Sequence, residues 1–181
     1  MKGNHHMSFD AGLLVLRVFI GVVLVAHGSQ KLFGWFSGPG LKGFTGWMAS
    51  MGLKPAAIWG IMGALSEFGG GNLLLLGLLG PVGSLAIIGA MLMAIGLAHW
   101  PKGFWGSKGG YEYPLVLLII SAVLGLVGPG SYSLDALLGI VLPTTLIFWV
   151  GLVLAIIVAA IGLTMNNRQT AASKQTASSA S

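Results

Sequence analysis

Long apolar runs dominate the chain, and short segments rich in glycine, proline and charged residues separate them. A membrane-spanning helix needs about 20 apolar residues, because the hydrocarbon core is about 30 Å thick and each helical residue adds about 1.5 Å. Five runs reach or approach this length, and we expect helices over residues 11–33, 55–79, 82–99, 111–128 and 143–164. The pattern therefore predicts an all-α membrane protein with five spans.

Two connecting segments carry shorter patterns. Over residues 41–51, apolar side chains recur at helical spacing on one face and polar ones occupy the other. This pattern is typical of a short helix that lies in the plane of the membrane interface. Further along, Ser133 can cap a short helix that contains Asp135.

Both ends of the chain are polar. Residues 1–10 are predicted to form a short external N-terminus, and residues 165–181 are predicted to form a disordered cytoplasmic tail rich in Ser, Thr, Ala and Gln. Arg17 interrupts the first apolar run, and no small-residue cleavage site closes this run. The run is therefore predicted to be a span and not a signal peptide.

Composition supports the membrane assignment. Of the 181 residues, 55% are hydrophobic and only 7% are charged, whereas soluble domains carry about 25% charged residues. So few charges cannot cover the surface of a water-soluble monomer. The chain has no cysteine, so it has no thiolate ligand for zinc or for an iron–sulfur cluster, and it forms no disulfide.

The distribution of basic residues predicts the orientation in the membrane. With five spans, the side of the N-terminus carries Lys2 alone, and the other side carries seven basic residues: Lys31, Lys42, Lys54, Lys102, Lys108, Arg168 and Lys174. Basic residues accumulate in cytoplasmic loops, so we expect the N-terminus outside and the C-terminus in the cytoplasm. The net charge of +5 reports this topology and does not indicate a nucleic-acid partner.

Two ionisable residues fall well inside the predicted spans. Glu67 lies near the middle of residues 55–79, and Arg17 lies on the first span. A charged side chain at the bilayer centre costs roughly 2.5–3.5 kcal/mol on insertion scales, so we expect Arg17 and Glu67 to form a buried ion pair. Such a pair either only fixes the register of the two helices or also lines a path for a ligand or a proton, and the sequence leaves both interpretations open.

Four further polar side chains are predicted to lie at one membrane level. His27 and Lys31 stand four residues apart on one helical face, His99 ends the third span, and Glu112 begins the fourth. One interpretation is an interfacial belt of paired and snorkelling side chains. The other is a polar pocket on the cytoplasmic side, suited to a quinone or a lipid headgroup, in which a His or Glu is the proton partner.

The sequence does not favour a metal site or a redox centre within this chain. His27 and His99 come from different helices, but His99 lies too close to the membrane surface to share a haem with His27. His5 and His6 are adjacent and terminal, and no nucleophile motif is evident. Catalysis is therefore uncertain, and the chain is at most a subunit of an oxidoreductase that receives electrons from a partner.

Small residues occur at two places within the predicted helices. The triplet at residues 69–71 is all glycine and lacks the Lys-Ser/Thr of a phosphate loop, so it predicts a kink or a close helix approach. On the third span, Ala86, Ala90, Ala94 and Ala98 lie four residues apart. Their spacing predicts a ridge for close helix packing.

Four ordered stretches resemble the DoxX family of small bacterial membrane proteins. They are RVFIGVVLVAHGSQKLFGW from Arg17, SEFGGGNLLLLGLLGP from Ser66, AHWPKGFWGSKGGYEYPL from Ala98 and GPGSYSLDALLG from Gly128. The resemblance covers residues 11–140 and implies a bundle of four membrane helices, to which the span at 143–164 is an addition. It also marks six motif positions: Arg17, His27, Lys31, Glu67, His99 and Glu112.

The resemblance implies a link to redox metabolism. Members of the family are associated with a terminal quinol oxidase, with thiosulfate:quinone oxidoreductase or with oxidative-stress complexes. It implies a protein of the bacterial inner membrane that works with respiratory or other oxidoreductase partners, next to a quinone. Two other functions fit the same residues: a carrier for a small solute or lipid, although no inverted repeat is evident, and a non-catalytic membrane scaffold.

Overall fold

The computed structural model describes residues 2–179, with side chains over residues 7–167, and the described chain is helical without any strand. Its seven α-helices are α1 Lys2–Phe33, α2 Gly40–Ser50, α3 Ala56–Leu76, α4 Val82–Ala94, α5 Glu112–Val127, α6 Leu134–Leu138 and α7 Thr144–Ser179. A π-helical turn, Ile95–His99, extends α4, and two 3₁₀ turns, Trp100–Lys102 and Gly106–Lys108, lead towards α5. The predicted all-α class is confirmed.

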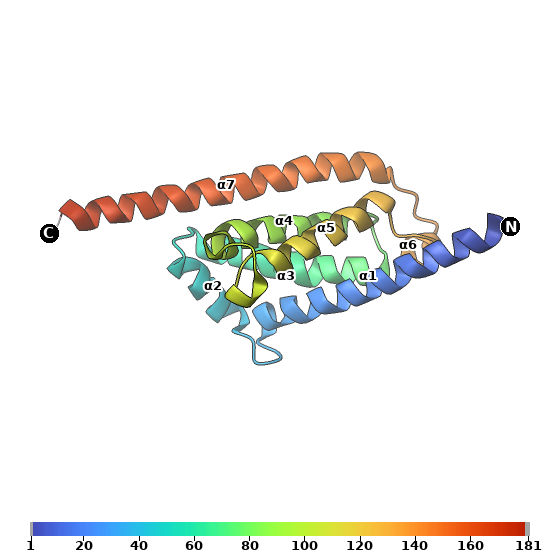
Figure 1. Ribbon diagram of the computed structural model, residues 1–181, viewed down its shortest axis with the longest axis horizontal. Helices are drawn as coiled ribbons and strands as arrows, with labels where there is room; N and C mark the ends of the chain where they lie inside the picture. Colours follow the sequence, from blue (N-terminus) through green and yellow to red (C-terminus); the bar gives the residue numbers. More distant parts are fainter. Residues whose placement is uncertain (1, 180–181) are drawn as a thin grey trace.

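Within the described residues, three helical segments are long and apolar enough to cross a membrane: Met7–Phe33, Val82–Lys102 and Thr144–Asn167. The helix α5 is a shorter apolar helix, and α3 carries Glu67 and Asn72 within its 21 residues. All five predicted segments thus form helices, and the long ones run roughly along the long axis of the molecule (Figure 1).

The two ends of the chain are more helical than the sequence pattern predicts. The first helix already begins at Lys2, and α7 continues through Ser179, so the prediction of a disordered tail is wrong over residues 165–179. A helix that is already nucleated extends at little cost, and Ala, Gln, Lys and Arg in this segment are good helix formers. Residues 180–181, also part of the predicted tail, lie outside the described chain.

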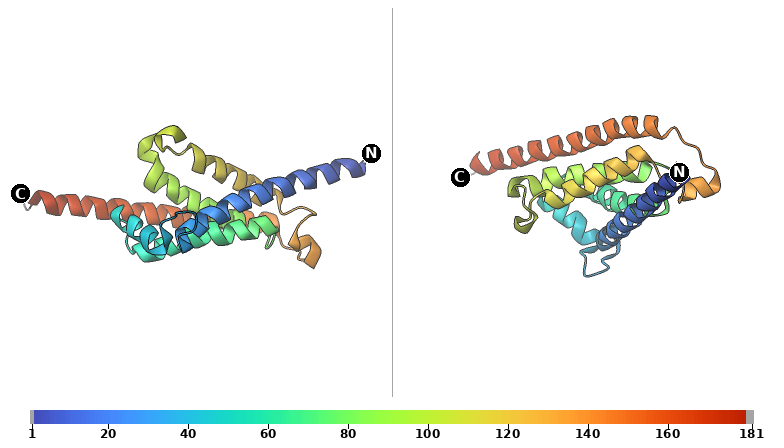
Figure 2. Two further views of the ribbon diagram at one scale, coloured as in Figure 1. Left: turned by 90° about the horizontal axis from the view of Figure 1, so that it is seen from below. Right: turned by 45° about the vertical axis from the view of Figure 1, so that its right-hand side comes forward.

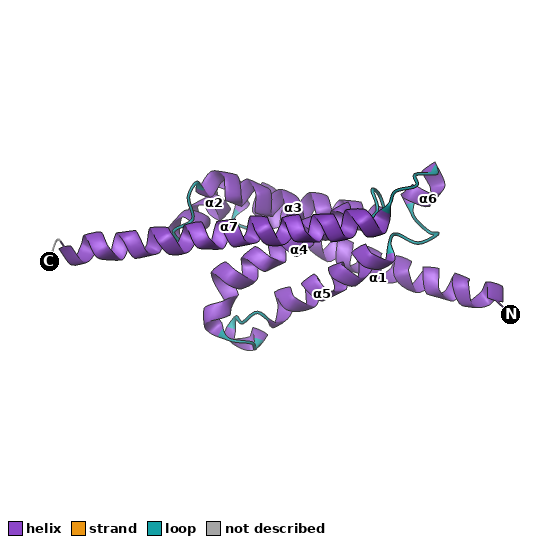
Figure 3. Ribbon diagram, turned by 90° about the horizontal axis from the view of Figure 1, so that it is seen from above, coloured by secondary structure: helices purple, strands orange, loops and turns teal. Residues whose placement is uncertain are grey.

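The two predicted short segments are confirmed as helices. The helix α2 occupies the expected segment, and its Phe44 and Met48 are buried. Ser133 caps α6, because its hydroxyl oxygen accepts a hydrogen bond from the backbone N–H of Ala136. As Figure 3 shows, α2 and α6 lie towards opposite ends of the bundle, and the connection between α4 and α5 projects from its side.

The helix α3 occupies the centre of the packing. It lies between α1 and α4, and α4 also contacts α5 and α7. The helices α1 and α7 border opposite faces of the molecule (Figures 1 and 2). Glycine permits the closest approach, since a Cβ added at Gly71 would lie 2.9 Å from the backbone nitrogen of Val25 on α1. The close helix approach predicted for the glycine triplet is confirmed at this position.

The contacts between α1 and α3 define an antiparallel register. A Cβ at Gly28 would lie 2.6 Å from the Cα of Phe68, and a Cβ at Gly77 would lie 2.7 Å from the Cζ of Arg17. Glu67, near the middle of α3, is therefore level with the last turns of α1. This offset between the two helices decides which charged side chains can meet.

Candidate functional site

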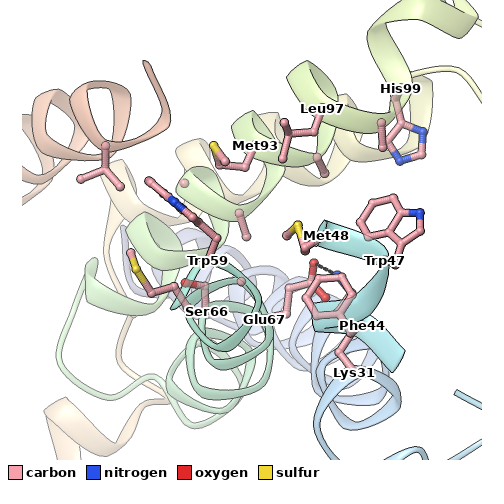
Figure 4. A pocket seen from close by; sticks show the side chains of 17 residues that line it. Lys31, Phe44, Trp47, Met48, Trp59, Ser66, Glu67, Met93, Leu97 and His99 are labelled. Atoms are coloured by element: carbon pink, nitrogen blue, oxygen red, sulfur yellow. Dashed lines mark hydrogen bonds and ion pairs between the residues drawn. The ribbon is translucent and has the colours of Figure 1, made fainter. Parts of the chain in front are cut away.

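A cavity of about 280 Å³ lies between α3 and α4, and α1, α2 and α7 complete its walls (Figure 4). Most of its lining is apolar or small: Phe44, Trp47, Met48, Trp59, Met62, Gly63, Gly89, Ala90, Met93, Ala94, Leu97, Ala98 and Val158. Its polar side chains are Lys31, Ser66, Glu67 and His99. Apolar walls with a few convergent polar groups are typical of a small-molecule site.

An ion pair joins α1 to α3 at one side of this cavity. The Lys31 Nζ donates a hydrogen bond to the Glu67 Oε1 at 2.5 Å, and the Glu67 side chain is only 5% exposed. The same Nζ lies 4.9 Å from the centroid of the Phe44 ring on α2, which is a cation–π distance. The positive charge thus has two partners, and both belong to the cavity lining.

The second carboxylate oxygen of Glu67 has no such partner. Its Oε2 is buried and accepts no hydrogen bond from any residue that the structure describes. Buried polar atoms in folded proteins are nearly always satisfied, and an unmade hydrogen bond at such an atom costs about 1–3 kcal/mol. Glu67 lines the cavity, so a small movement of its carboxylate would bring this oxygen to a donor group there.

His99 reaches the cavity from the π-helical turn. Its Nδ1 lies 2.8 Å from the carbonyl oxygen of Gly109, and a carbonyl oxygen can only accept, so Nδ1 carries a proton. In the neutral imidazole, Nε2 is then a hydrogen-bond acceptor. Single π-helical turns within α-helices are frequent at functional sites. In Figure 4, His99 and Trp47 lie together at one side of the cavity, across from Trp59.

The structure does not bring Arg17 and Glu67 together, so the predicted ion pair between them is wrong. Arg17 is 3% exposed, and its guanidinium donates hydrogen bonds to the backbone carbonyls of Pro129 and Tyr132. It lies beside Gly77, the residue that follows α3 and stands ten residues beyond Glu67, which corresponds to about 15 Å along a helix. The sequence gives the depth of a residue on its own helix but not the offset between two helices.

A second buried cluster lies at the α6 end of the bundle. The carboxylate of the buried Asp135 accepts hydrogen bonds from the backbone N–H groups of Leu79 at 2.9 Å and Gly80 at 2.6 Å. Together with Arg17, it fastens the segment between α5 and α6 to α1 and to the turn between α3 and α4. The sequence places Asp135 on a short helix, but this contact is absent from the prediction because its partners are backbone atoms.

Only two of the four residues predicted to share a pocket line the cavity, namely Lys31 and His99. The ring of His27 instead lies 5.8 Å from the ring of Tyr113 on α5. Glu112 accepts a hydrogen bond from the backbone N–H of Gly106 at 2.8 Å and so closes the loop before α5. These two side chains have structural partners outside the lining.

The sequence pattern does not reveal the apolar lining. Apolar residues such as Trp59 and Val158 resemble lipid-facing positions when only the sequence is considered. The alanine ridge on α4 is the sequence feature that indicates part of this lining. Ala86 packs as predicted, since a Cβ at Gly70 would lie 3.2 Å from its Cβ, but Ala90 and Ala94 border the cavity and leave space. The ridge therefore serves both packing and the site.

The long apolar helices and the charged residues buried between them define a multi-pass membrane protein. Its family is shown by sequence comparison. The DoxX family model matches residues 12–100, which include Lys31, Glu67 and His99. The chain is 30% identical over 132 residues to "Putative oxidoreductase CatD" of Bacillus subtilis (strain 168), a match that covers 71% of this chain and 87% of that protein. The chain belongs to the DoxX family, and no solved structure matches it.

Proposed function

We propose that this protein is a membrane subunit of a redox system and that the cavity binds the head group of a quinone. The observation that carries the proposal is the unpartnered Oε2 of the buried Glu67 in an apolar cavity. A quinone ring has an apolar body and polar oxygens at its edge, which matches apolar walls with few polar groups. The name of the Bacillus subtilis relative, an oxidoreductase, supports a redox role.

Each polar group of the cavity has a distinct role in this proposal. Lys31 donates a hydrogen bond to Glu67 Oε1 and holds the carboxylate in place through the ion pair. Glu67 Oε2 accepts a hydrogen bond from a quinol hydroxyl and can take its proton, and His99 Nε2 is a second acceptor. A bound quinone would supply two-electron, two-proton chemistry, and we propose that the electrons are exchanged with a partner protein. Aromatic and methionine side chains exclude water from the head group.

We further propose that α1, α3, α4, α5 and α7 all span the bacterial inner membrane. In this arrangement residues 11–140 form the four-helix core, α7 is an additional span, the N-terminus is outside and the C-terminus is cytoplasmic. The ion pair with Lys31 lets α3 enter the bilayer despite Glu67, since a paired charge is far less costly than an isolated one. The basic residues near the predicted cytoplasmic ends of the helices support the orientation.

The proposal is tested by purifying the full chain in a mild detergent and identifying the quinones and lipids that accompany it. We expect quinone with the wild type, and much less with Glu67→Gln or His99→Ala. Glu112→Gln is the matched control, because Glu112 lies outside the cavity lining and bonds within its own loop. Wild-type protein that carries no quinone and binds none when it is added would contradict the proposal. A phospholipid that depends on Glu67 would identify a lipid site instead.

A further inference from the structure

The cavity beside Glu67 is at the small end of the range for ligand sites. Its volume is about 280 Å³, whereas sites for whole drug-sized ligands measure about 300–1,000 Å³. The polar pair of Lys31 and Glu67 lies at the α1 and α2 side, and Trp59 and Met93 stand at the other side (Figure 4). A ligand whose head is bound at the polar pair and that carries a long chain can extend past Trp59 and Met93.

The lining indicates where such a chain can leave. Met62 on α3 is 43% exposed and Val158 on α7 is 39% exposed, although both border the cavity. Small residues of α4, Gly89 and Ala90, also line the cavity. The helix α7 packs mainly against α4, with smaller contacts to α5, and makes few backbone contacts with α3. The partly exposed Met62 and Val158 therefore mark the edge of the cavity between α3 and α7, which we call the passage.

This passage faces an apolar surface. Exposed side chains near Met62 and Val158 on the same two helices are Leu65, Leu154 and Ile161. The described part of α7 from Thr144 to Asn167 carries no charged residue. The opening therefore leads into hydrocarbon when the protein is in a membrane. An apolar chain fits such an opening, because it brings no polar group that would lack a hydrogen-bond partner.

The position of α7 sets the wall of the passage. A Cβ added at Gly162 would lie 2.7 Å from the Cε of Met93 and 3.0 Å from the Cη2 of Trp59. Both side chains border the cavity, so the absence of a side chain at Gly162 allows them to pack directly against α7. The helix that lies beyond the family-model match thus shapes the far side of the site.

We propose that the passage between Met62 and Val158 conducts the apolar tail of the ligand from the head-group site into the bilayer. The inference rests on the proposed function, because it takes the head-group site from there. It assigns α7 a role in specificity: the site takes membrane-dissolved ligands that have a single long tail, and the tail enters laterally between α3 and α7.

The test compares two probes that share one head group, a decyl-substituted benzoquinone and its tailless parent, with the full-length protein in lipid nanodiscs. Val158→Trp should fill the passage and lower the affinity for the decyl probe by about tenfold, while the affinity for the tailless parent stays near the wild-type value. Met62→Trp narrows the same passage from α3 and should lower the affinity for the decyl probe in the same way. The second variant keeps the test usable if one of the two fails to fold. Val153→Trp is the control, because Val153 is 55% exposed on α7 and outside the lining.

Two results would overturn the passage: unchanged affinity of both variants for the decyl probe, or an equal loss for both probes. Other results would instead contradict the proposed function itself. If neither probe binds the wild type, or if Glu67→Gln binds both as the wild type does, there is no quinone head site, and the passage falls with it.

Discussion

Lys31 and Glu67 show how two charges persist together within apolar surroundings. Each charge alone would cost roughly 2.5–3.5 kcal/mol on insertion scales, and the contact at 2.5 Å satisfies the lysine and one carboxylate oxygen. The other oxygen is buried and accepts no hydrogen bond from the described residues. This unsatisfied oxygen is the feature on which the proposed binding site rests.

We predict that Lys31→Met destabilises the protein more than the double variant Lys31→Met/Glu67→Gln. Removal of one partner from a buried ion pair costs about 3–5 kcal/mol, whereas neutral replacement of both partners is often much less costly. Thermal unfolding in detergent, followed by tryptophan fluorescence, gives the two midpoints. If the double variant has a lower melting midpoint than the single variant, the ion pair stabilises the protein beyond the mutual neutralisation of its two charges.

Arg17 binds backbone carbonyls away from the cavity, so its substitution should lower the stability of the protein without changing its affinity for a quinone. Arg17→Lys keeps the charge but loses the planar fork that reaches the carbonyls of Pro129 and Tyr132. We expect a stability loss of about 1–3 kcal/mol from the unmet carbonyl groups, together with unchanged affinity for the decyl-substituted benzoquinone. Thermal unfolding and nanodisc binding measure the two quantities. Weaker binding with unchanged stability would place Arg17 in the site.

The cost of placing polar groups in a membrane identifies the important residues from the sequence, but it does not identify their partners. Arg17, Lys31, Glu67 and His99 are conspicuous in the sequence because polar groups are rare in apolar helices. The pairing of Glu67 depends on an antiparallel register that glycine contacts set, and the bonds of Arg17 end on backbone carbonyls. Neither feature has a signature in the order of the amino acids.

At the scale of helices, periodicity and length predict the elements well. The five apolar runs, the short amphipathic helix α2 and the capped helix α6 all appear where the pattern places them. The extension of α7 through Ser179 was not predicted, because composition typical of disorder is overridden when a long helix precedes it. The sequence predicts a polar pocket that includes Lys31 and His99 but not the apolar lining of the cavity, since the space between helices depends on their relative positions.

The glycine triplet on α3 offers a matched pair of substitutions in one helix. Gly71→Ala should destabilise the protein, because the new Cβ would lie 2.9 Å from the backbone nitrogen of Val25 and 3.1 Å from the carbonyl oxygen of Gly21. Gly69→Ala meets no atom within 4 Å, so the higher helix propensity of alanine should stabilise α3 by up to about 1 kcal/mol. Thermal midpoints of the two variants in the same detergent should shift in opposite directions. Equal shifts would contradict the register of α1 and α3.

For the whole molecule, the proposed topology makes a prediction that is independent of any ligand. A reporter fused after residue 132 should be active outside the cytoplasm, and a reporter fused after residue 181 should be active in the cytoplasm, because five spans place these points on opposite sides. Fluorescent and alkaline phosphatase fusions measure the two locations. The reverse pattern, or both reporters on one side, would overturn the five-span arrangement or its orientation.

The cluster of Arg17 and Asp135 at the α6 end affects which of its partner residues can change during evolution. Arg17 and Asp135 hold backbone carbonyl and N–H groups, so the identity of the side chains at Leu79 and Tyr132 does not enter these bonds. Every residue other than proline brings the same backbone groups to such a position. Sequence drift at Tyr132 is therefore compatible with these bonds. Leu79 is less free, because its φ of 59° lies in the left-handed region that few residue types adopt readily, and Arg17 and Asp135 have no substitute of equal geometry.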